Sequence, residues 1–264
     1  MNRFALVATH HKTGSVWMRT VFRAIARNLS VPYVSLSNPR PGAPDQPPFP
    51  AIVFSDHSDF SKWPYPLEDE RCRIFHLIRD PRDVLISAMH YHRTAKEKWL
   101  LKPRDSFQGM SYQEKINSLP DDRSRYLFEM ERSAGRVIRD MLNWNYNRPN
   151  CFECKYEEIV GDREMRIVTN ILRHFGLEGG ELETSLRAFW DNSLFGALQG
   201  GQSVHIRSGE RRQWPSVFDD VLQEEFLSRF PDALVRLGYE KDNSWHGSAP
   251  YAVETADDGA NALA

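Results

Sequence analysis

The sequence predicts one α/β domain with a central parallel sheet flanked by helices. Two short apolar runs, Phe4–Ala8 and Ile74–Ile78, are typical of buried parallel strands, and a helical pattern follows each of them. The 264 residues are enough for one large domain with a sizeable core. We therefore expect residues 1–246 to form this domain. Residues 247–264 are small, polar and without periodicity, so we expect a mobile C-terminal tail there.

The first strand leads into a turn that is suited to bind a phosphate. Residues 9–15 (THHKTGS) place one lysine, one glycine and three hydroxyls before a helix that begins near Val16. Backbone N–H groups at a helix N-terminus attract anions, Lys12 adds a charge, and Gly14 lets the backbone come close. The turn is not a Walker A loop, in which the lysine follows the glycine. The alternative is an ordinary strand–helix connection with a surface lysine.

The second strand ends at another candidate phosphate site. Arg79 follows it directly, at the edge where open α/β sheets bind ligands. Asp80 is predicted to be the N-cap of the next helix, Pro81 its first residue, and Asp83 the reciprocal acid of a capping box. Ser87 lies one turn beyond Asp83, so Arg79 and Ser87 could hold one phosphate together. In the alternative, Arg79 only pairs with one of the two aspartates and Ser87 is inert.

The remaining segments are assigned by their breakers and their periodicity. The proline-rich segment Asn38–Pro50 predicts a surface loop, and Lys96–Leu119 predicts a loop with helical turns. Apolar residues at helical spacing predict one long amphipathic helix over Ser124–Tyr146. The other expected strands and helices are Ala51–Phe54, Asp83–Tyr91, Cys151–Tyr156, Arg163–Phe175, Leu182–Trp190 and Phe218–Arg229.

Composition and charge exclude several classes of protein. The net charge of −2 does not favour nucleic acid as a partner, and no apolar stretch is long enough to span a membrane. No signal-peptide-like segment precedes the first strand, so we expect a cytoplasmic protein. Cys151 and Cys154 have CxxC spacing but no second pair, which favours reduced structural thiols over a zinc or redox site.

Four segments, in this order, resemble the motifs of sulfotransferases that use 3′-phosphoadenosine 5′-phosphosulfate (PAPS). Thr9–Trp17 resembles the family's 5′-phosphosulfate loop, TYPKSGTTW, and Ile78–Ser87 resembles its 3′-phosphate motif. Lys155–Ile159 is similar to the YED segment, whose tyrosine approaches the adenine. Residues 206–218, with Ile206-Arg207-Ser208-Gly209 followed by Trp214 and Phe218, are similar to the RKG…W…F stretch that closes on the 3′-phosphate. Together the motifs extend over the chain from residue 4 to about residue 240.

The resemblance implies a P-loop NTPase-like, three-layer fold, PAPS as the sulfuryl donor, adenosine 3′,5′-bisphosphate (PAP) as the product, and no metal. Lys12 is implied to stabilise the bridging and leaving-group oxygens. His57 is implied to be the base, because it stands where the family often has KTH; His10, His11 or a carboxylate are the alternatives. The implied nucleotide-binding residues are Lys12, Thr13, Gly14, Ser15, Val16, Trp17, Arg79, Ser87, Tyr156, Arg207, Ser208 and Gly209.

The chain departs from the family pattern at several positions. His11 replaces a proline, Val16 a threonine, Ser208 the lysine of RKG, and Ser55 the lysine of KTH. These departures leave a non-catalytic nucleotide-binding protein as an alternative. A P-loop-type kinase is disfavoured by the order of lysine and glycine and by the lack of an evident Mg²⁺-binding acid at a strand end.

The acceptor follows from the resemblance only as a class. We expect a hydroxyl or an amine of a small molecule, a lipid or a glycan. The sequence leaves the oligomeric state open, with a homodimer as one option.

Overall fold

The structure, a computed structural model, describes residues 1–37, 46–193, 196 and 212–245. The predicted tail and Arg207, Ser208 and Gly209 lie outside these residues, so the predictions made for them stay predictions.

A parallel sheet lies at the centre of the described residues, as the sequence predicted. It has five strands in the order β2-β3-β1-β4-β5, and every pair of neighbours is parallel. The strands are β1 (Phe4–Thr9), β2 (Tyr33–Ser35), β3 (Ala51–Ser55), β4 (Cys72–Ile78) and β5 (Cys151–Lys155). The short edge strand β2 was not predicted, because its three half-buried residues do not form an apolar run.

The carboxyl ends of these parallel strands share one edge of the sheet. Ala8 lies level with Ser55 and His76, and Ile78 lies level with Lys155. The turns that follow β1, β3, β4 and β5 therefore meet at this edge, where α/β proteins bind their ligands.

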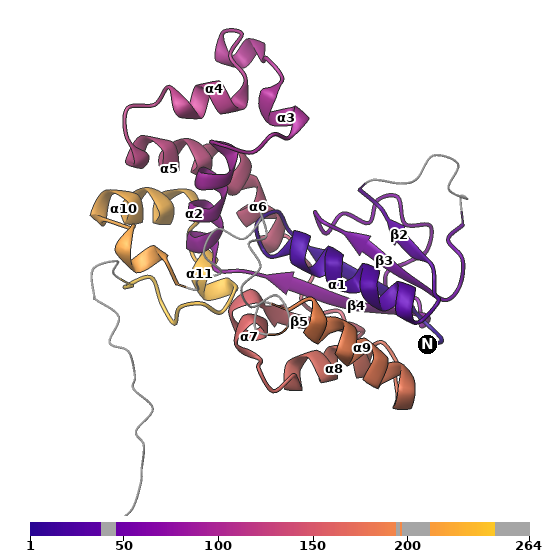
Figure 1. The fold of residues 1–264 in the computed structure, drawn as a ribbon. Coiled ribbons are helices and arrows are strands. Elements are labelled where there is room, and N and C mark those ends of the chain that lie inside the picture. The colour runs from indigo at the N-terminus through magenta and orange to yellow at the C-terminus, as the bar shows by residue number, and fades with distance from the viewer. Residues whose placement is uncertain (38–45, 194–195, 197–211, 246–264) are drawn as a thin grey trace, which may run out of the picture.

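Helices cover one face of the sheet (Figure 1). They are α1 (Ser15–Asn28), α7 (Tyr156–Gly161), α8 (Arg166–His174) and α9 (Gly179–Asp191). Their apolar side chains share a core with alternate strand residues such as Val7, Phe54 and Phe75. The opposite face, which includes Leu6 and Val53, packs against Trp63 and other aromatic residues of the loops. This alternation buries both faces, as a central parallel sheet requires.

A second group of helices forms a lobe with its own core beyond the carboxyl edge of the sheet (Figure 1). We call it the helical lobe. It comprises α2 (Pro81–His92), α3 (Lys98–Leu101), η1 (Asp105–Phe107), α4 (Tyr112–Asn117), α5 (Asp122–Glu131), α6 (Ser133–Leu142), η2 (Trp214–Ser216), α10 (Asp220–Arg229) and α11 (Ala233–Arg236). No helix in the described parts of the chain is both long and apolar enough to cross a membrane.

The prediction of one long helix over Ser124–Tyr146 was wrong. The chain breaks at Arg132 (φ −115°, ψ −118°), which ends α5 and precedes α6. Side chains satisfy the N–H groups freed at the break: Ser133 donates to the Tyr112 hydroxyl (3.4 Å) and Ala134 to Glu129 (3.3 Å). Periodicity did not reveal the break because both helices bury the same apolar stripe.

Candidate functional site

The turn after β1 is the loop that the sequence predicted. Gly14 has a left-handed backbone (φ 100°) and is the N-cap of α1, so the first N–H groups of α1 face the end of β1. A Cβ atom on Gly14 would lie 3.0 Å from the Tyr156 ring. Both the conformation and the space therefore require glycine here.

The hydroxyls of this loop hold the loop itself. Thr13 Oγ1 and Ser15 Oγ donate to the His10 carbonyl at 2.9 and 2.5 Å, and Thr9 Oγ1 donates to Ser15 Oγ at 3.0 Å. Thr13 is fully buried, whereas Ser15 also lines the cavity described below. These contacts fix the shape of the loop before any anion binds.

Lys12 is a largely desolvated cation. Its Nζ lies 3.6 Å from the centre of the Tyr91 ring, and its backbone is left-handed (φ 69°). Burial, followed by repulsion from Arg79, lowers the pKa of Lys12 to about 8. An anion placed beside Lys12 would offset both effects.

Arg79 lies next to this loop at the end of β4. Its guanidinium donates to the Lys12 carbonyl (3.2 Å), lies 3.7 Å from Asp83 Oδ2 and covers the Tyr156 ring at 4.6 Å. Ser87 of α2 lines the same cavity. The predicted start of α2 is confirmed, because Asp80 is the N-cap and its side chain accepts the N–H of Arg82.

The reciprocal capping role predicted for Asp83 was wrong. The Asp80 N–H is bound instead by Glu157, which comes from α7 (3.1 Å). Asp83 is fully buried, and it accepts the N–H groups of Arg212, Gln213 and Trp214 at 2.8, 3.0 and 3.1 Å. Burial is the main cause that raises the pKa of Asp83. Asp83 therefore fixes the start of the described segment 212–245 against α2.

Tyr156 is the first residue of α7 and joins the two candidate phosphate sites. Its ring contacts Gly14, lies 6.2 Å from the Trp17 ring and supports Arg79. Trp17 is held in turn by a hydrogen bond from Nε1 to the Asn192 carbonyl (2.8 Å). Trp214, by contrast, is buried under Arg82, whose guanidinium lies 3.5 Å from the centre of its ring.

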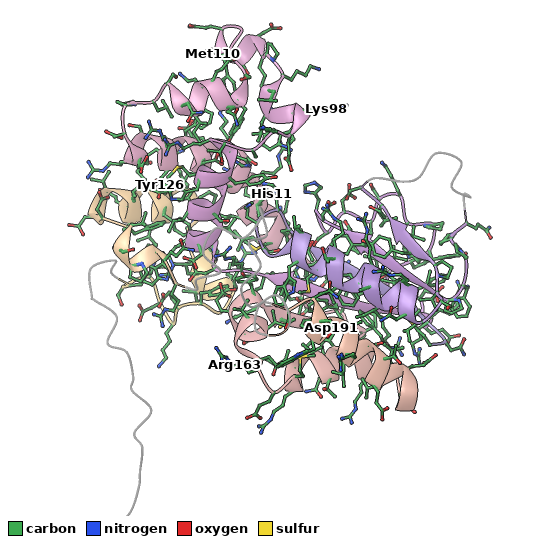
Figure 2. All side chains as sticks on the ribbon, in the orientation of Figure 1. His11, Lys98, Met110, Tyr126, Arg163 and Asp191 are labelled. Atoms are coloured by element: carbon green, nitrogen blue, oxygen red, sulfur yellow. The ribbon has the colours of Figure 1, made fainter. Side chains whose placement is uncertain are left out.

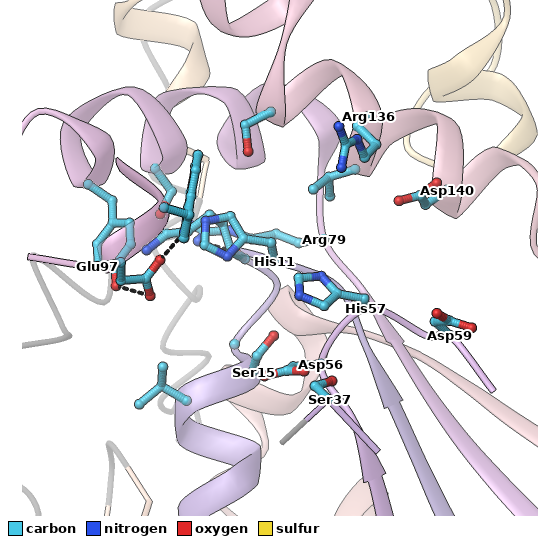
Figure 3. Close-up of a pocket in the computed structure, with 18 of the residues that line it drawn as sticks. His11, Ser15, Ser37, Asp56, His57, Asp59, Arg79, Glu97, Arg136 and Asp140 are labelled. Carbon is cyan, nitrogen blue, oxygen red and sulfur yellow. Dashed lines mark hydrogen bonds between the residues drawn. The ribbon is translucent and has the colours of Figure 1, made fainter. Parts of the chain in front are cut away.

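His57 follows β3 and lines the cavity with an exposed side chain. Figure 3 shows His57 beside His11, with Asp59 and Asp140 on its other side. Asp56, the residue before it, forms an ion pair with Arg19 at 2.5 Å. The structure thus brings the predicted base to the edge of the sheet that carries Lys12 and Arg79.

One cavity of about 1760 Å³ joins these groups. It lies between the carboxyl edge of the sheet and the helical lobe. Of the described residues implied to be the base or to bind the nucleotide, all except Thr13 line it: Lys12, Gly14, Ser15, Val16, Trp17, His57, Arg79, Ser87 and Tyr156. Of the two alternative histidine bases, His11 lines it and His10 does not. The sequence missed Glu157 and Asp83 as structural links, because the backbone groups that they bind are remote in sequence.

The donors of this cavity suit an anionic ligand more than a metal ion. Lys12, Arg79 and the N-terminus of α1 all attract negative charge. Within the described residues, no group of three or more His, Cys, Asp or Glu side chains could hold a metal. The cysteines Cys72, Cys151 and Cys154 are free.

Comparisons with known proteins place the chain among one group of enzymes. A model of the sulfotransferase domain family matches residues 3–234. The solved structure of mouse sulfotransferase SULT7A1 complexed with PAP is 16% identical, with a TM-score of 0.59 over 88% of this chain and 84% of that one. A retinol dehydratase in complex with androsterone and the inactive cofactor PAP is 17% identical, with a TM-score of 0.56 over 87% and 80% of the two chains. Among curated proteins, no sequence matches the chain.

Proposed function

This chain belongs to the sulfotransferase domain family, and from that premise we propose that it moves the sulfuryl group of PAPS to an acceptor and leaves PAP. One observation carries the proposal. Two cationic sites, at Lys12 and at Arg79, follow neighbouring strands of the sheet and open into one cavity with the Tyr156 ring beside them. Two phosphates joined through an adenosine match this arrangement.

The loop of residues 9–15 holds the 5′-phosphosulfate in this proposal. The N–H groups of the first turn of α1, from Ser15 to Trp17, bind the phosphate oxygens, and Gly14 admits them. Lys12 stabilises the charge that develops on the leaving oxygen during in-line transfer. Positioning and charge stabilisation supply most of the catalysis in such transfers.

Arg79 and Ser87 bind the 3′-phosphate, and Tyr156 packs against the adenine. An arginine fork and a serine hydroxyl are suitable donors to one phosphate. The family pattern adds Arg207, Ser208 and Gly209 to this site and Thr13 and Val16 to the loop. Asp83 helps to position this site, because it contacts Arg79 and also binds the backbone N–H groups of residues 212–214.

The acceptor binds in the rest of the cavity, beside His57. His57 takes the proton of the acceptor hydroxyl or amine, a role that suits an imidazole near neutral pH. The acceptor class in this proposal is a small molecule, a lipid or a glycan; the retinol dehydratase named above binds androsterone. The three free cysteines favour a reducing, cytoplasmic location.

Transfer of labelled sulfate from PAPS to a mixed panel of acceptors tests the function. The panel holds phenols, sterols, fatty alcohols, amines and oligosaccharides, and the products are separated by chromatography. We expect label on at least one class, and a loss of that label in Lys12→Ala. PAP binding without transfer to any acceptor would support a non-catalytic nucleotide-binding protein. Transfer of the γ-phosphate of ATP would support a kinase.

A further inference from the structure

The fully buried carboxylate of Glu129 is linked to His11 through the ring of His92. The Nε2 atoms of His11 and His92 lie 3.1 Å apart, and His92 Nδ1 lies 2.6 Å from Glu129 Oε1. His92 and Glu129 are fully buried, whereas His11 is half-buried and lines the cavity. The planes of the two rings are parallel, with an angle of 2° between them. We call these residues the His11 relay; Figure 2 shows His11 where the helical lobe meets the N-terminal end of α1.

Hydrogen-bond chemistry fixes the proton positions when both rings are neutral. A carboxylate can only accept, so His92 Nδ1 carries a proton and donates it to Glu129. His92 Nε2 is then an acceptor, which makes His11 Nε2 the donor. Nδ1 of His11 is left without a proton and is the nitrogen that can accept one.

The surroundings favour a neutral His11. Burial is the main cause that lowers the pKa of His11 well below its ordinary value, and His92, Lys12 and His57 act in the same direction. The Tyr91 ring also packs against it. Around Glu129, the Tyr112 hydroxyl and the Ala134 N–H stabilise the carboxylate.

We propose that His11 shares with His57 the task of accepting the proton of the acceptor, and that His92 and Glu129 act as its positioning residues. A base that is oriented by a hydrogen bond to a third group, such as a carboxylate, activates nucleophiles in other enzymes. In this chain His92 carries that link from His11 to Glu129. The inference rests on the proposed function. It gives a role to a residue that replaces the family's proline.

The acceptor O–H bond breaks, a new O–S bond forms, and the bond between the sulfur and the bridging oxygen of PAPS breaks to release PAP. His11 Nδ1 takes the proton, while the proton on His11 Nε2 passes to His92 Nε2. The resulting His92 imidazolium is stabilised by the Glu129 carboxylate. The relay resets when the proton on His92 Nε2 returns to His11 Nε2 and the proton taken from the acceptor leaves His11 Nδ1 for solvent through the cavity.

A second relay in the same loop offers a matched control. His10 Nε2 lies 2.8 Å from His76 Nε2, and His76 Nδ1 lies 2.5 Å from Glu153 Oε2. His10 is fully buried, however, and is not among the residues that line the cavity. Glu153→Gln therefore makes the same chemical change as Glu129→Gln in a relay that does not reach the acceptor.

The test compares His57→Ala, His11→Gln and the double variant in single-turnover sulfuryl transfer. The glutamine retains a donor within reach of His92 but cannot act as a base. If the two bases share the step, each single variant keeps about a tenth or more of the wild-type rate. The double variant should then fall by about 10²–10⁴-fold, the usual contribution of a general base. Unchanged Kd values for PAP confirm that the variants are folded.

The pH profile separates catalysis from structure. In the His57→Ala background the remaining rate depends on the His11 relay, and a carboxylate beside an imidazole favours its protonated form. Adding Glu129→Gln makes the relay a weaker proton acceptor, so the rate should fall and its low-pH limb should move to lower pH. Adding Glu153→Gln should leave both unchanged.

Two results would overturn the inference while leaving the proposed function intact. One is a His57→Ala variant that is as slow as the double variant, which would make His57 the sole base. The other is a low-pH limb that does not move in Glu129→Gln. If the wild-type protein transfers no sulfuryl group from PAPS, the proposed function itself fails.

Discussion

At the scale of single residues, the buried Lys12 makes the proposed site sensitive to pH. Its pKa of about 8 in the free protein means that raising the pH above this value removes its charge. A bound anion favours the charged form, so binding should take up a proton in this range. We predict that the affinity for PAP falls as the pH rises from 7 to 9.5.

Titration calorimetry in buffers of different ionisation enthalpy measures this uptake directly. Lys12→Ala is the control, since it should abolish the uptake near pH 8.5. An affinity of the wild-type protein that is constant over the range would contradict the assignment of Lys12.

Arg79 gives a second prediction, because it is assigned to one phosphate only. Arg79→Ala removes a charge-assisted hydrogen bond worth about 1.5–3 kcal/mol, so PAP should bind roughly 10- to 150-fold more weakly. Adenosine 5′-phosphate lacks the 3′-phosphate, so its Kd should change little. Equal losses for both nucleotides would place Arg79 at the 5′ site or in the support of the loop.

Some site residues could be predicted from the sequence, and others could not. Lys12 and Gly14 were found because they lie in the short turn between β1 and α1, and Arg79 because it directly follows β4; in both places the local pattern fixes the position. Asp83 was misassigned because the N–H groups that it binds are 129–131 residues away in sequence. The His11 relay was missed for the same reason, since His11 lies in the turn after β1 whereas His92 and Glu129 lie on α2 and α5.

At the scale of elements, the break between α5 and α6 depends on Gly135. A Cβ atom there would lie 1.8 Å from the Met130 carbonyl oxygen and 3.3 Å from the Phe230 ring. We predict that Gly135→Ala lowers the free energy of unfolding by about 1–3 kcal/mol, as overpacking does. The backbone oxygen has to move, which outweighs the higher helix propensity of alanine.

Gly180 of α9 is the matched control for this prediction. A Cβ atom on Gly180 would meet nothing within 4 Å. Gly180→Ala should therefore leave the stability unchanged or raise it by up to about 1 kcal/mol. Urea denaturation followed by circular dichroism measures both. A stable Gly135→Ala variant would show that the break does not need glycine.

Most of the long strands and helices could be predicted from the sequence, but the residues at which they begin and end were harder to predict. The strands β1, β3 and β4 are mainly apolar runs, β5 was also predicted although it contains Glu153 and Lys155, and the N-cap predicted for α2 was correct. The helix expected at Arg163–Phe175 begins at Arg166, because the Asp162 side chain binds the N–H groups of Arg166 and Val168. Side-chain contacts of this kind are difficult to predict from periodicity alone.

At the scale of the whole molecule, the fold class followed from the strand–helix order, but the position of the helical lobe did not. The lobe gathers residues from positions 81–142 and 214–245 into one core. Because the lobe lies opposite the carboxyl edge of the sheet, a cavity forms between the two. This placement depends on contacts between residues far apart in sequence, such as the hydrogen bond from the Arg212 N–H to Asp83.

The most direct test of the account compares the thermal stability of the protein with two nucleotides. PAP, in the presence of EDTA, at about 100 times its Kd should stabilise the fold by roughly 2.7 kcal/mol, which raises Tm by several degrees. ATP with Mg²⁺ lacks the 3′-phosphate that Arg79 and Ser87 are proposed to bind, so it should raise Tm much less. A strong rise with ATP and Mg²⁺, together with no rise for PAP in EDTA, would contradict the central claim.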